Sequence, residues 1–443
     1  MTRITRDTSS SRGPRRTARV FATVAATAAL SLLLAACGSS GGASTAGGIT
    51  AWGTTADKPL TEPSVTEFNA ANSKTQIKAN YFGTNDYKDK IRTAINSPQA
   101  PTLVYTWGGG TMAQYVKAGL LRDLTPDLKD DKAFTDRLIP SVAAGGINGG
   151  KTYAIPMDPT SPVVLYFNED VLKKAGVEQP KTWDELLAAV PKIKDAGFAP
   201  IALGGGSKWP YLMWIEYLVD RIGGPQVFQN ILDNKPDAWS DPAVIKANTM
   251  IQQLVKAGGF AEGFASVSAD TNADLALMVT GKAAMLLQGA WAYSGISQID
   301  PTFESSGKLG FGPFPAVEGG KGDPKNIAGN PASYWAVSAK ATDAQAKTAM
   351  NYLTKTVWND AYTKSVIDAG NIPPLTGIGP QLKGDFAKGL NDMIADAPNF
   401  QQSWDLALSP AASSAFWTQL DLLFNGSETP QQFSDNMNKT IGK

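Results

Sequence analysis

The stretch Ile49-Thr-Ala-Trp-Gly53 has strand character and ends on a tryptophan followed by a glycine. Helix-like and strand-like segments alternate after it. The first series has a helix over 63–71, a strand over 75–82, a helix over 86–96 and a strand over 103–106; the second has a strand over 163–167, helices over 168–175 and 183–196, a strand over 200–203 and a helix over 210–222. This alternation predicts an α/β architecture with a largely parallel sheet.

The length and charge of the chain limit the classes of protein to which it can belong. With 443 residues it is long enough for two domains of ordinary size. Six arginines but only one acidic residue lie before residue 20, so the rest of the chain is mildly acidic although the whole has a formal net charge of +0. An acidic body argues against a nucleic-acid partner, which favours a basic surface.

The residue types that are absent exclude several kinds of chemistry. The chain has no histidine, and its one cysteine is Cys37. Ser-His-Asp and Cys-His catalysis and most zinc sites are therefore excluded, as are an internal disulfide and a cysteine-based metal site. We expect neither a metal nor a cofactor.

The amino terminus has the parts of an export signal: an arginine-rich start, an apolar run over 20–36, Leu34-Ala-Ala-Cys37 and a Gly/Ser-rich linker. The Leu-Ala-Ala-Cys segment resembles the lipobox of bacterial lipoproteins. It implies a signal peptide over 1–36, lipidation of Cys37, and a flexible tether over 37–48 at the extracellular face of the cell membrane.

Two alternatives for this segment stay open, a transmembrane anchor and a plain signal peptide with a chance cysteine. The apolar run is only about 17 residues long, which is marginal for a membrane span. The export route, general or twin-arginine, also stays undecided.

Trp107-Gly-Gly-Gly110 follows the predicted strand over 103–106, and Gly108-x-Gly110-x-x-Ala113 matches a relaxed dinucleotide-binding pattern. A dinucleotide site also needs a following strand with an acidic residue about 20 residues further on, and this chain has none there. Two interpretations are left. The glycines form a tight turn, or they form a ligand loop in which Gly108 lets a sugar approach the backbone while Trp107 offers a flat apolar face.

A second glycine-rich segment, Gly145-Gly-Ile-Asn-Gly-Gly-Lys-Thr152, satisfies the phosphate-loop pattern. That pattern must join a strand to a following helix. Here residues 134–142 look helical, and the two prolines of Tyr153-Ala-Ile-Pro-Met-Asp-Pro159 prevent a helix from starting. Asn148-Gly149 instead predicts a hairpin turn, so the segment is not expected to bind a nucleoside triphosphate.

Two blocks of sequence carry a family resemblance. The first is Gly150-Lys-Thr-Tyr-Ala-Ile-Pro156, Val164-Leu-Tyr-Phe-Asn168 and Pro180-Lys-Thr-Trp-Asp-Glu-Leu186, and the second is Gly281-Lys-Ala-Ala-Met-Leu-Leu-Gln-Gly-Ala-Trp291. With the lipobox, they resemble the extracellular solute-binding proteins, family 1, of carbohydrate ABC importers, in a layout similar to maltose-binding protein.

The resemblance implies a periplasmic-binding-protein-like fold of class II, in which two α/β lobes enclose a ligand cleft. One lobe would comprise 49–157 plus 309–355, the other 158–308 plus 356–443, and the crossing segments would form a multi-segment hinge. A ligand that touches both lobes only in the closed form would drive closure. The closed form, a monomer, would deliver its solute to a membrane permease.

Aromatic side chains are the expected walls of a sugar site, because a pyranose has apolar C–H faces. The expected walls are Trp52, Trp107, Trp209, Trp291 and Trp404, of which Trp291 resembles the family's stacking tryptophan. The expected polar partners are Asn85, Asp86, Asp158, Asn330 and Asn371, although Asn and Asp are also ordinary caps and turn formers. Trp183 resembles a helix-start residue, and the tryptophans expected in the core are Trp214, Trp335, Trp358 and Trp417.

Several stacking walls favour an oligosaccharide, and the Trp-Gly-Gly-Gly loop resembles binding proteins for xylo-oligosaccharides. We therefore expect a binding protein that is not an enzyme. A secreted carbohydrate-active enzyme is one alternative, but nothing in the sequence pairs candidate carboxylates such as Asp158, Glu216 and Asp220. A binding protein for a non-sugar solute, such as a glycerol phosphate ester or a polyamine, is the other.

Overall fold

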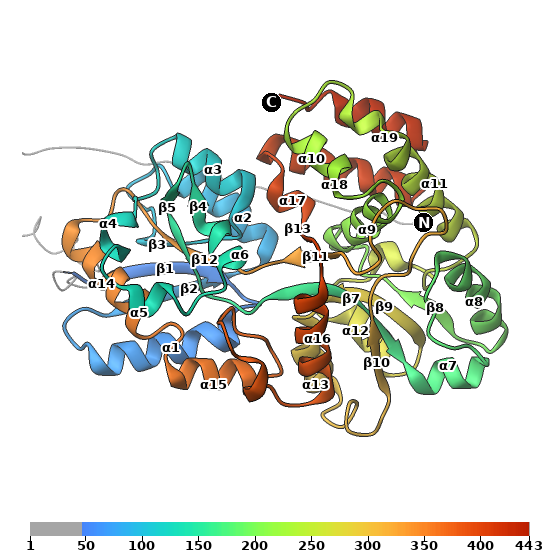
Figure 1. Cartoon of the computed structure of the whole chain (residues 1–443), viewed down its shortest axis with the longest axis horizontal. Helices are drawn as coiled ribbons and strands as arrows, with labels where there is room; N and C mark the ends of the chain where they lie inside the picture. The colour runs from blue at the N-terminus through green and yellow to red at the C-terminus, as the bar shows by residue number, and fades with distance from the viewer. Residues whose placement is uncertain (1–46, 443) are drawn as a thin grey trace, which may run out of the picture. The chain divides into compact units, whose positions relative to one another are not determined.

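The computed structural model describes residues 47–442. The expected signal peptide, the lipidation site Cys37 and almost all of the tether lie outside the described residues. Two mixed β-sheets, each with its own helices, organise the described part of the chain (Figure 1).

The first sheet has the strand order β2-β1-β3-β12-β6. Its strands are β1 (Ile49–Thr54), β2 (Ile77–Phe82), β3 (Leu103–Thr106), β6 (Ala154–Pro156) and β12 (Tyr334–Val337). Strands β1, β2 and β3 are parallel, whereas β12 is antiparallel to both β3 and β6. Its helices are α1 (Lys58–Ala71), α2 (Thr84–Ala94), α3 (Gly109–Lys117), α4 (Thr125–Leu128), α5 (Lys132–Thr135), α6 (Pro140–Ala143), α14 (Asp343–Lys355) and α15 (Asp360–Asp368).

The second sheet has the order β13-β11-β7-β9-β8, and β10 also pairs with β7. Its strands are β7 (Ser161–Asn168), β8 (Ala199–Ala202), β9 (Ala283–Gly289), β10 (Leu309–Gly312), β11 (Ile327–Asn330) and β13 (Phe400–Gln402). Its helices are α7 (Glu169–Ala175), α8 (Trp183–Asp195), α9 (Leu212–Gly223), α10 (Pro225–Leu232), α11 (Pro242–Lys256), α12 (Ala273–Val279), α13 (Ala292–Ile299), α16 (Asp385–Asp396), α17 (Trp404–Ala407), α18 (Pro410–Phe424) and α19 (Pro430–Asn438).

The prediction of a largely parallel sheet is wrong. In the second sheet, β7 is antiparallel to β9, β10 and β11, and β12 is antiparallel to its neighbours in the first. Both β7 and β12 are reached when the chain crosses from the other sheet. A strand that is not reached through a helical crossover on its own sheet has no reason to be parallel to its neighbours.

The crossing segments are residues 157–160, between β6 and β7, and residues 331–333, between β11 and β12. They lie together, because Met157 donates its backbone N–H to the carbonyl of Ser333 at 2.8 Å. A third segment joins them where Thr160 donates to the carbonyl of Ile372 at 2.9 Å.

The strand pairing divides a range that we expected in one lobe. Residues 309–355 were expected with the first lobe, but β10 and β11 pair with β7 of the second sheet, and only β12 and α14 lie with the first. Likewise α15, expected with the second lobe, packs against α1. The sequence of the crossing segments alone did not reveal on which side each strand pairs.

Strand β7 shows how the second sheet builds its core. All eight of its residues are buried. Val163, Leu165 and Phe167 join the cluster beneath α8, α9 and α11, whereas Val164 and Tyr166 join the cluster with α12, α13 and α16. Residues 162–167 are apolar without interruption because alternate side chains point to opposite faces and helices cover both faces.

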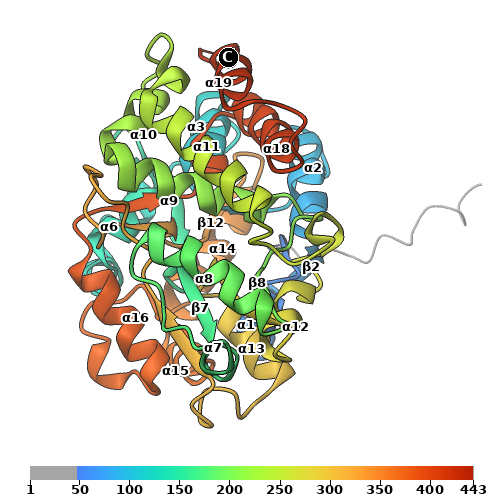
Figure 2. The same ribbon diagram turned by 90° about the vertical axis from the view of Figure 1, so that its right-hand side faces the viewer.

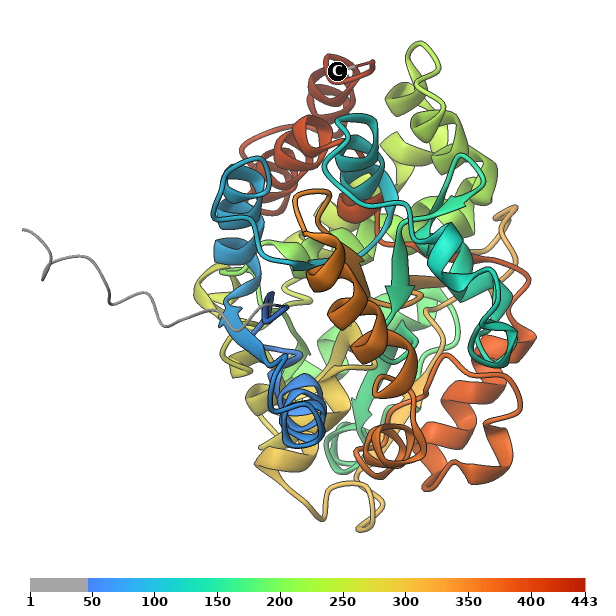
Figure 3. The ribbon, with the colours of Figure 1, turned by 90° about the vertical axis from the view of Figure 1, so that its left-hand side faces the viewer.

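The helices cover these sheets in a regular way. In Figure 2, α8 and α9 lie in front of the second sheet, in agreement with their contacts to β8 and β9. Figure 3 shows α14, in orange, running across the first sheet, where it contacts β1 and β12. Helix α8 begins where a capping box predicts, because Thr182 and Glu185 bond each other's backbone N–H groups.

The predicted hairpin is confirmed, with its turn one residue later than the predicted Asn148-Gly149. Strands β4 (Ile147–Asn148) and β5 (Lys151–Thr152) pair antiparallel, and Gly149 and Gly150 form the turn with φ of +56° and +75°. Two left-handed residues are what a two-residue turn of this type requires, and glycine adopts them freely. No helix begins at Lys151-Thr152, so the segment lacks the geometry of a phosphate loop.

Candidate functional site

Trp209 and Trp291 come together beyond neighbouring strand ends of the second sheet. Trp209 starts a short 3₁₀ turn, Trp209–Tyr211, after β8, and Trp291 follows β9. Strands β8 and β9 are parallel neighbours, so their carboxyl ends lie at the same edge. The two rings have centroids 6.1 Å apart and planes inclined by 60°. Both side chains are partly buried against the core of the second sheet.

Trp209 is fixed by a carboxylate that the sequence analysis did not select. Its indole Nε1 donates to Asp270 Oδ1 at 3.2 Å, and Ser207 Oγ donates to Asp270 Oδ2 at 2.8 Å. Asp270 lies 61 residues from Trp209 in the chain, so no local pattern could have indicated it. An indole held through its N–H has a defined orientation, which suits a stacking wall.

Gly289 makes room for the Trp291 ring. A Cβ atom at position 289 would lie within the indole of Trp291, far inside van der Waals contact. Gly289 N–H donates to Gln288 Oε1 at 3.0 Å, and Gln288 Nε2 donates to Asp274 Oδ2 at 3.1 Å. Burial raises the pKa of Asp274 to about 6. The backbone beneath the Trp291 ring is therefore linked, through the hydrogen bonds of Gln288, to a buried titratable carboxyl.

Trp107 lies at the first sheet, just after β3 as expected. Its ring packs edge to face against Tyr105, at 4.8 Å between centroids, and against Tyr87 at 6.0 Å. The Lys88 ammonium lies 4.9 Å from its centroid. The ring is therefore held in place, and an ammonium occupies part of its surface.

The three glycines after Trp107 serve close backbone packing. A Cβ at Gly110 would lie 2.6 Å from the carbonyl oxygen of Ala407, and a Cβ at Gly109 would collide with the carbonyl of Leu406. At Gly108, which has φ of +77°, a Cβ would lie 2.5 Å from the carbonyl oxygen of Gly145. The start of α3 thus packs directly on α17, an element of the second sheet. This packing explains the glycines without a ligand.

The crossing segments carry buried polar atoms that lack a protein partner. Among the described residues these include Asp158 Oδ1, Thr160 Oγ1 and Asn330 Oδ1. Asn330 is the strand partner of Ser161, so the atoms belong to paired segments. Unpaired buried polar atoms are costly unless water or a ligand satisfies them. Two expected polar partners, Asp158 and Asn330, are therefore brought to one place.

Asp158 is 5% exposed. Its Oδ2 accepts a long hydrogen bond, 3.5 Å, from the Tyr105 hydroxyl, which also bonds Ser333 Oγ at 2.6 Å. Burial, and then the neighbouring carboxylate of Asp57, raise the pKa of Asp158 well above its usual range. Tyr105, Ser333 and Asp57 are further members of this site that sequence reasoning missed, since each reads as an ordinary strand, loop or cap residue.

The other expected residues lie on separate elements. Trp52 lies inside β1, which continues to Thr54, and its ring packs edge to face against Phe82 at 5.2 Å. Asn85 and Asp86 are exposed in the first turn of α2. Asn371 is buried in the third crossing segment, and its amide reaches only its own loop, at Ala369 O, 3.4 Å away.

Trp404 is part of the core of the second sheet. It is 1% exposed, and its ring stacks on Phe228 with centroids 4.2 Å apart and planes inclined by 4°. Its backbone N–H donates to Glu216 Oε1 at 2.5 Å. The ring has no free face in this structure. Trp183 starts α8 as expected, and Trp214, Trp335 and Trp358 are buried as expected, whereas Trp417 is only partly buried.

The carboxylates named as candidates for an enzyme have structural partners. Glu216 holds α17 through Trp404, and burial raises its pKa well above the usual range. Asp220 pairs with Arg221 at 2.7 Å and accepts from Asn326 at 3.0 Å. These interactions fix α9 to the loop between β10 and β11.

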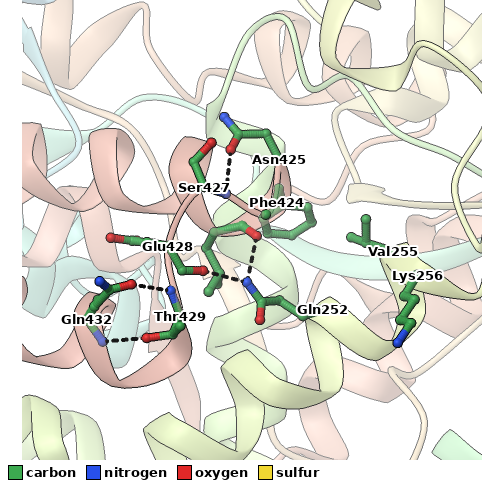
Figure 4. A pocket seen from close by; sticks show the side chains of 11 residues that line it. Gln252, Val255, Lys256, Phe424, Asn425, Ser427, Glu428, Thr429 and Gln432 are labelled. Atoms are coloured by element: carbon green, nitrogen blue, oxygen red, sulfur yellow. Dashed lines mark hydrogen bonds between the residues drawn. The ribbon is translucent and has the colours of Figure 1, made fainter.

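Two surface cavities lie away from the residues discussed above. One, of about 370 Å³, lies between α11 and the segment joining α18 to α19, where Gln252 Nε2 donates to the carbonyls of Leu423 and Glu428 at 3.2 and 2.8 Å (Figure 4). The other, of about 460 Å³, lies beside α7. None of the expected ligand residues lines either cavity.

Residues 47–442 hold no group of three or more acidic, histidine or cysteine side chains placed to bind a metal ion. Their helices include none with the length and apolar character that crossing a bilayer requires.

The fold and the site together define a two-lobed α/β binding protein, with an aromatic pair at the strand ends of one sheet and polar crossing segments beside it. The family model for bacterial extracellular solute-binding proteins matches residues 47–360. The chain belongs to this family, and the resemblance inferred from its sequence blocks is confirmed.

Individual relatives narrow the comparison. A probable sugar-binding periplasmic protein of Mesorhizobium japonicum is 30% identical over 203 residues, which cover 45% of this chain and 46% of the relative. An sn-glycerol-3-phosphate-binding periplasmic protein of Rhizobium meliloti is 25% identical over 327 residues, which cover 68% and 70%. The chain thus spans about half the length of several curated relatives, and more of others.

A solved structure from a study of xylan utilization by the thermophilic bacterium Caldanaerobius polysaccharolyticus is similar over 89% of this chain and 100% of its own, with a TM-score of 0.79 and 28% identity. The similarity extends over both sheets. It confirms the two-lobed fold expected from the sequence.

Proposed function

We propose that this protein is the substrate-binding lipoprotein of an ABC importer, and that it captures an extracellular oligosaccharide and delivers it to a membrane permease powered by a separate ATPase. The Trp209–Trp291 pair, oriented by Asp270, is the observation that carries this proposal. Two differently inclined indoles at a sheet edge can stack on successive sugar rings, and a carboxylate beside them can accept sugar hydroxyls.

The crossing segments provide the polar part of the same proposal. Asp158, Thr160 and Asn330 have unpartnered buried oxygens, and oxygen acceptors suit the hydroxyl groups of a sugar. We propose that these segments form the hinge, so that closure brings Trp52 and Trp107 of the first lobe toward a ligand that rests on the second lobe. Asn85 and Asp86, which are exposed, remain proposed polar partners at the rim, and Asn371 remains a proposed polar partner in the third crossing segment.

Xylo-oligosaccharides are the favoured ligands. The relative from the xylan study supports this class. The similarity to a glycerol-phosphate-binding protein supports a non-sugar ester instead. A phosphate ester requires unpaired Arg or Lys, but near the aromatic pair Lys208 is paired with Asp421 at 2.9 Å, and Asp270 is an acid. We therefore favour the sugar.

The anchoring part of the proposal concerns residues outside the described range. Cleavage after residue 36 and lipidation of Cys37 would leave a monomeric receptor on a flexible tether at the outer face of the membrane. Metabolic labelling of the expressed protein with an alkyne fatty acid tests this. Label that is lost in Cys37→Ser supports the proposal, and equal label in both proteins contradicts it.

Binding is tested by tryptophan fluorescence during titration with xylo-, cello-, malto- and chito-oligosaccharides, with chromatographic analysis of the sugars afterwards. We expect a saturable change with the xylo series and no cleavage. Trp291→Ala should weaken binding about tenfold or more, and the matched variant Trp291→Phe, which keeps an aromatic face, should weaken it less. No response to any series contradicts the oligosaccharide proposal, and cleavage of any series would establish an enzyme.

A further inference from the structure

Lys88 of α2 contacts elements of both sheets. Its Nζ lies 3.0 Å from Asp405 Oδ2 of α17. The same ammonium lies over two indole rings, 4.9 Å from the centroid of Trp107 and 4.5 Å from that of Trp417. Trp107 follows β3 of the first sheet, whereas Asp405 and Trp417 lie on helices packed against the core of the second. We call these four residues the Lys88 bridge.

The two charged side chains of the Lys88 bridge are only partly exposed to solvent. The Lys88 side chain is 26% exposed and that of Asp405 is 7% exposed. A cation within about 6 Å of an indole centroid is attracted by the ring, and more so when it is partly desolvated. An ion pair with one partner still reached by solvent also stays sensitive to dissolved salt.

Each charged residue of the bridge directly follows a buried aromatic anchor. Tyr87, before Lys88, is 1% exposed and donates its hydroxyl to Tyr105 O at 2.5 Å. Trp404, before Asp405, is 1% exposed and donates its backbone N–H to Glu216. The backbones that carry the two charges are thus fixed to opposite lobes, so forming the pair costs little additional conformational entropy.

Neighbouring contacts place the bridge in a continuous zone between the lobes. Gln402 Nε2 donates to the carbonyl of Trp107 at 2.5 Å. Gly109 and Gly110, which follow Trp107, pack on the backbone of the α17 segment. These contacts are short and uncharged, so Lys88 supplies the charge-dependent part of the zone.

We propose that the Lys88 bridge stabilises the arrangement of the two lobes in this structure and makes that arrangement depend on ionic strength. The inference rests on the proposed function, because it requires lobes that move. While the bridge is formed, the ammonium covers part of the Trp107 ring. Separation of the lobes breaks the pair and exposes that ring, so the bridge regulates the first-lobe wall of the proposed sugar site.

The distance between the lobes tests this directly. Nitroxide labels at Lys129→Cys and Lys246→Cys, both exposed and on helices or helix ends of different lobes, report it by pulsed electron spin resonance. The full chain carries Cys37→Ser, since Cys37 is the only native cysteine. The variants are Lys88→Met and Asp405→Asn. The matched control is Lys90→Met, which removes an exposed charge from the same helix where the ammonium contacts Phe82 of its own lobe.

At low salt, we expect both variants to shift or broaden the distance distribution by about 2 Å or more relative to the labelled parent protein, which keeps Lys88 and Asp405. About 1 M NaCl, where the screening length falls to about 3 Å, should move the parent protein toward the variants and leave the variants unchanged. Lys90→Met should match the parent. Identical distributions for Lys88→Met, Asp405→Asn and the parent at both salt concentrations would overturn the proposal.

The same samples separate this inference from the proposed function. If xylo-oligosaccharide changes the distances but the two variants behave as the parent does, the lobes move and the bridge does not control them. If no salt, variant or sugar changes the distances, both the bridge and the hinge are contradicted. Folding of each variant is checked by its thermal unfolding curve, so that a shift from unfolding is not counted as support.

Discussion

Two glycine-rich loops of this protein are similar in sequence but differ in the residues that their glycines and tryptophans contact. Trp107-Gly-Gly-Gly110 follows β3, and Gly204-Gly-Gly-Ser-Lys-Trp209 follows β8. In the first loop Gly109 and Gly110 pack on the backbone of the α17 segment of the other lobe, and the tryptophan ring shares its surface with Lys88. In the second they pack on residues of the same lobe, where a Cβ at Gly204 would lie 2.6 Å from Ala269 Cβ, and the tryptophan pairs with Trp291.

The difference teaches that glycine next to tryptophan does not by itself identify a ligand loop. Close backbone contact uses the missing Cβ in both places. What separates the loops is which partner the glycines approach and how much of the indole is left free. On this basis the first loop joins the lobes, and the second presents the stronger candidate wall.

The largest expected effect comes from filling the first loop. Gly110→Val places a branched side chain against the carbonyls of Ala407 and Leu408, which belong to a backbone anchored in the core. We expect a loss of about 3 kcal/mol or more in the free energy of unfolding. Urea denaturation measures it. Gly83→Ala is the matched control, since a Cβ there meets only Asp86 at 4.0 Å, and it should cost at most about 1 kcal/mol, because a helix N-cap prefers glycine to alanine. Equal stability of the two variants would mean that the lobe contact is loose in solution.

The next largest effect concerns Asp274, which supports Gly289 beneath the Trp291 ring through Gln288. Burial raises the pKa of Asp274 to about 6, whereas an unfolded aspartate titrates near 4. Because the folded pKa is the higher one, the contribution of Asp274 to stability is complete below about pH 4 and is lost as the pH rises through about 6. From pH 4 to pH 7 the parent should lose about 2 to 3 kcal/mol relative to Asp274→Asn.

Parallel urea curves at several pH values measure this loss. The asparagine amide opposes the Gln288 amide, so Asp274→Asn carries a constant cost, and the informative quantity is how the difference changes with pH. A difference that stays flat between pH 4 and pH 7 would show that Asp274 titrates normally. Tryptophan emission recorded in the same experiment reports whether Trp291 follows the titration.

Much of the fold was accessible from local sequence. The strand over 103–106 and the start of α8 at Trp183 are as predicted, because an apolar run and a capping box are local signals. The pairing of β7 and β12 was not accessible, since it depends on where the crossing segments lead the chain. Helix α1 begins at Lys58, earlier than predicted, with Pro63 accommodated inside it.

The candidate site was accessible only in part. Trp209 was selected because it follows a glycine-rich loop after the predicted strand over 200–203, and Trp291 because it resembles the family's stacking tryptophan. The structure brings the two together. Asp270 and Lys88 were missed because their partners are 61 and 317 residues away. Trp404 was selected on layout, yet a ring followed by Asp-Leu-Ala gives no sign that Phe228 will stack on it.

The comparison of the two loops predicts unequal effects on sugar binding. Trp291→Ala removes a ring from the proposed wall and should lower affinity for xylo-oligosaccharide about tenfold or more. Trp107→Ala should lower it only about threefold, because that ring packs on Tyr105 and Lys88 and offers less surface. Isothermal titration calorimetry measures both. A greater loss for Trp107→Ala would reverse the assignment of the stronger wall.

The smallest effect distinguishes orientation from charge at Asp270. Asp270→Asn keeps an oxygen that can accept a hydrogen bond from the Trp209 indole, so the affinity for xylo-oligosaccharide should stay within about twofold of the parent. Asp270→Ala removes that hydrogen bond and should lower the affinity about fivefold, on the order of one hydrogen bond. The same calorimetric titration decides between them. Equal losses in the two variants would indicate that the negative charge itself contacts the sugar, and the second loop would then supply a polar partner as well as an aromatic wall.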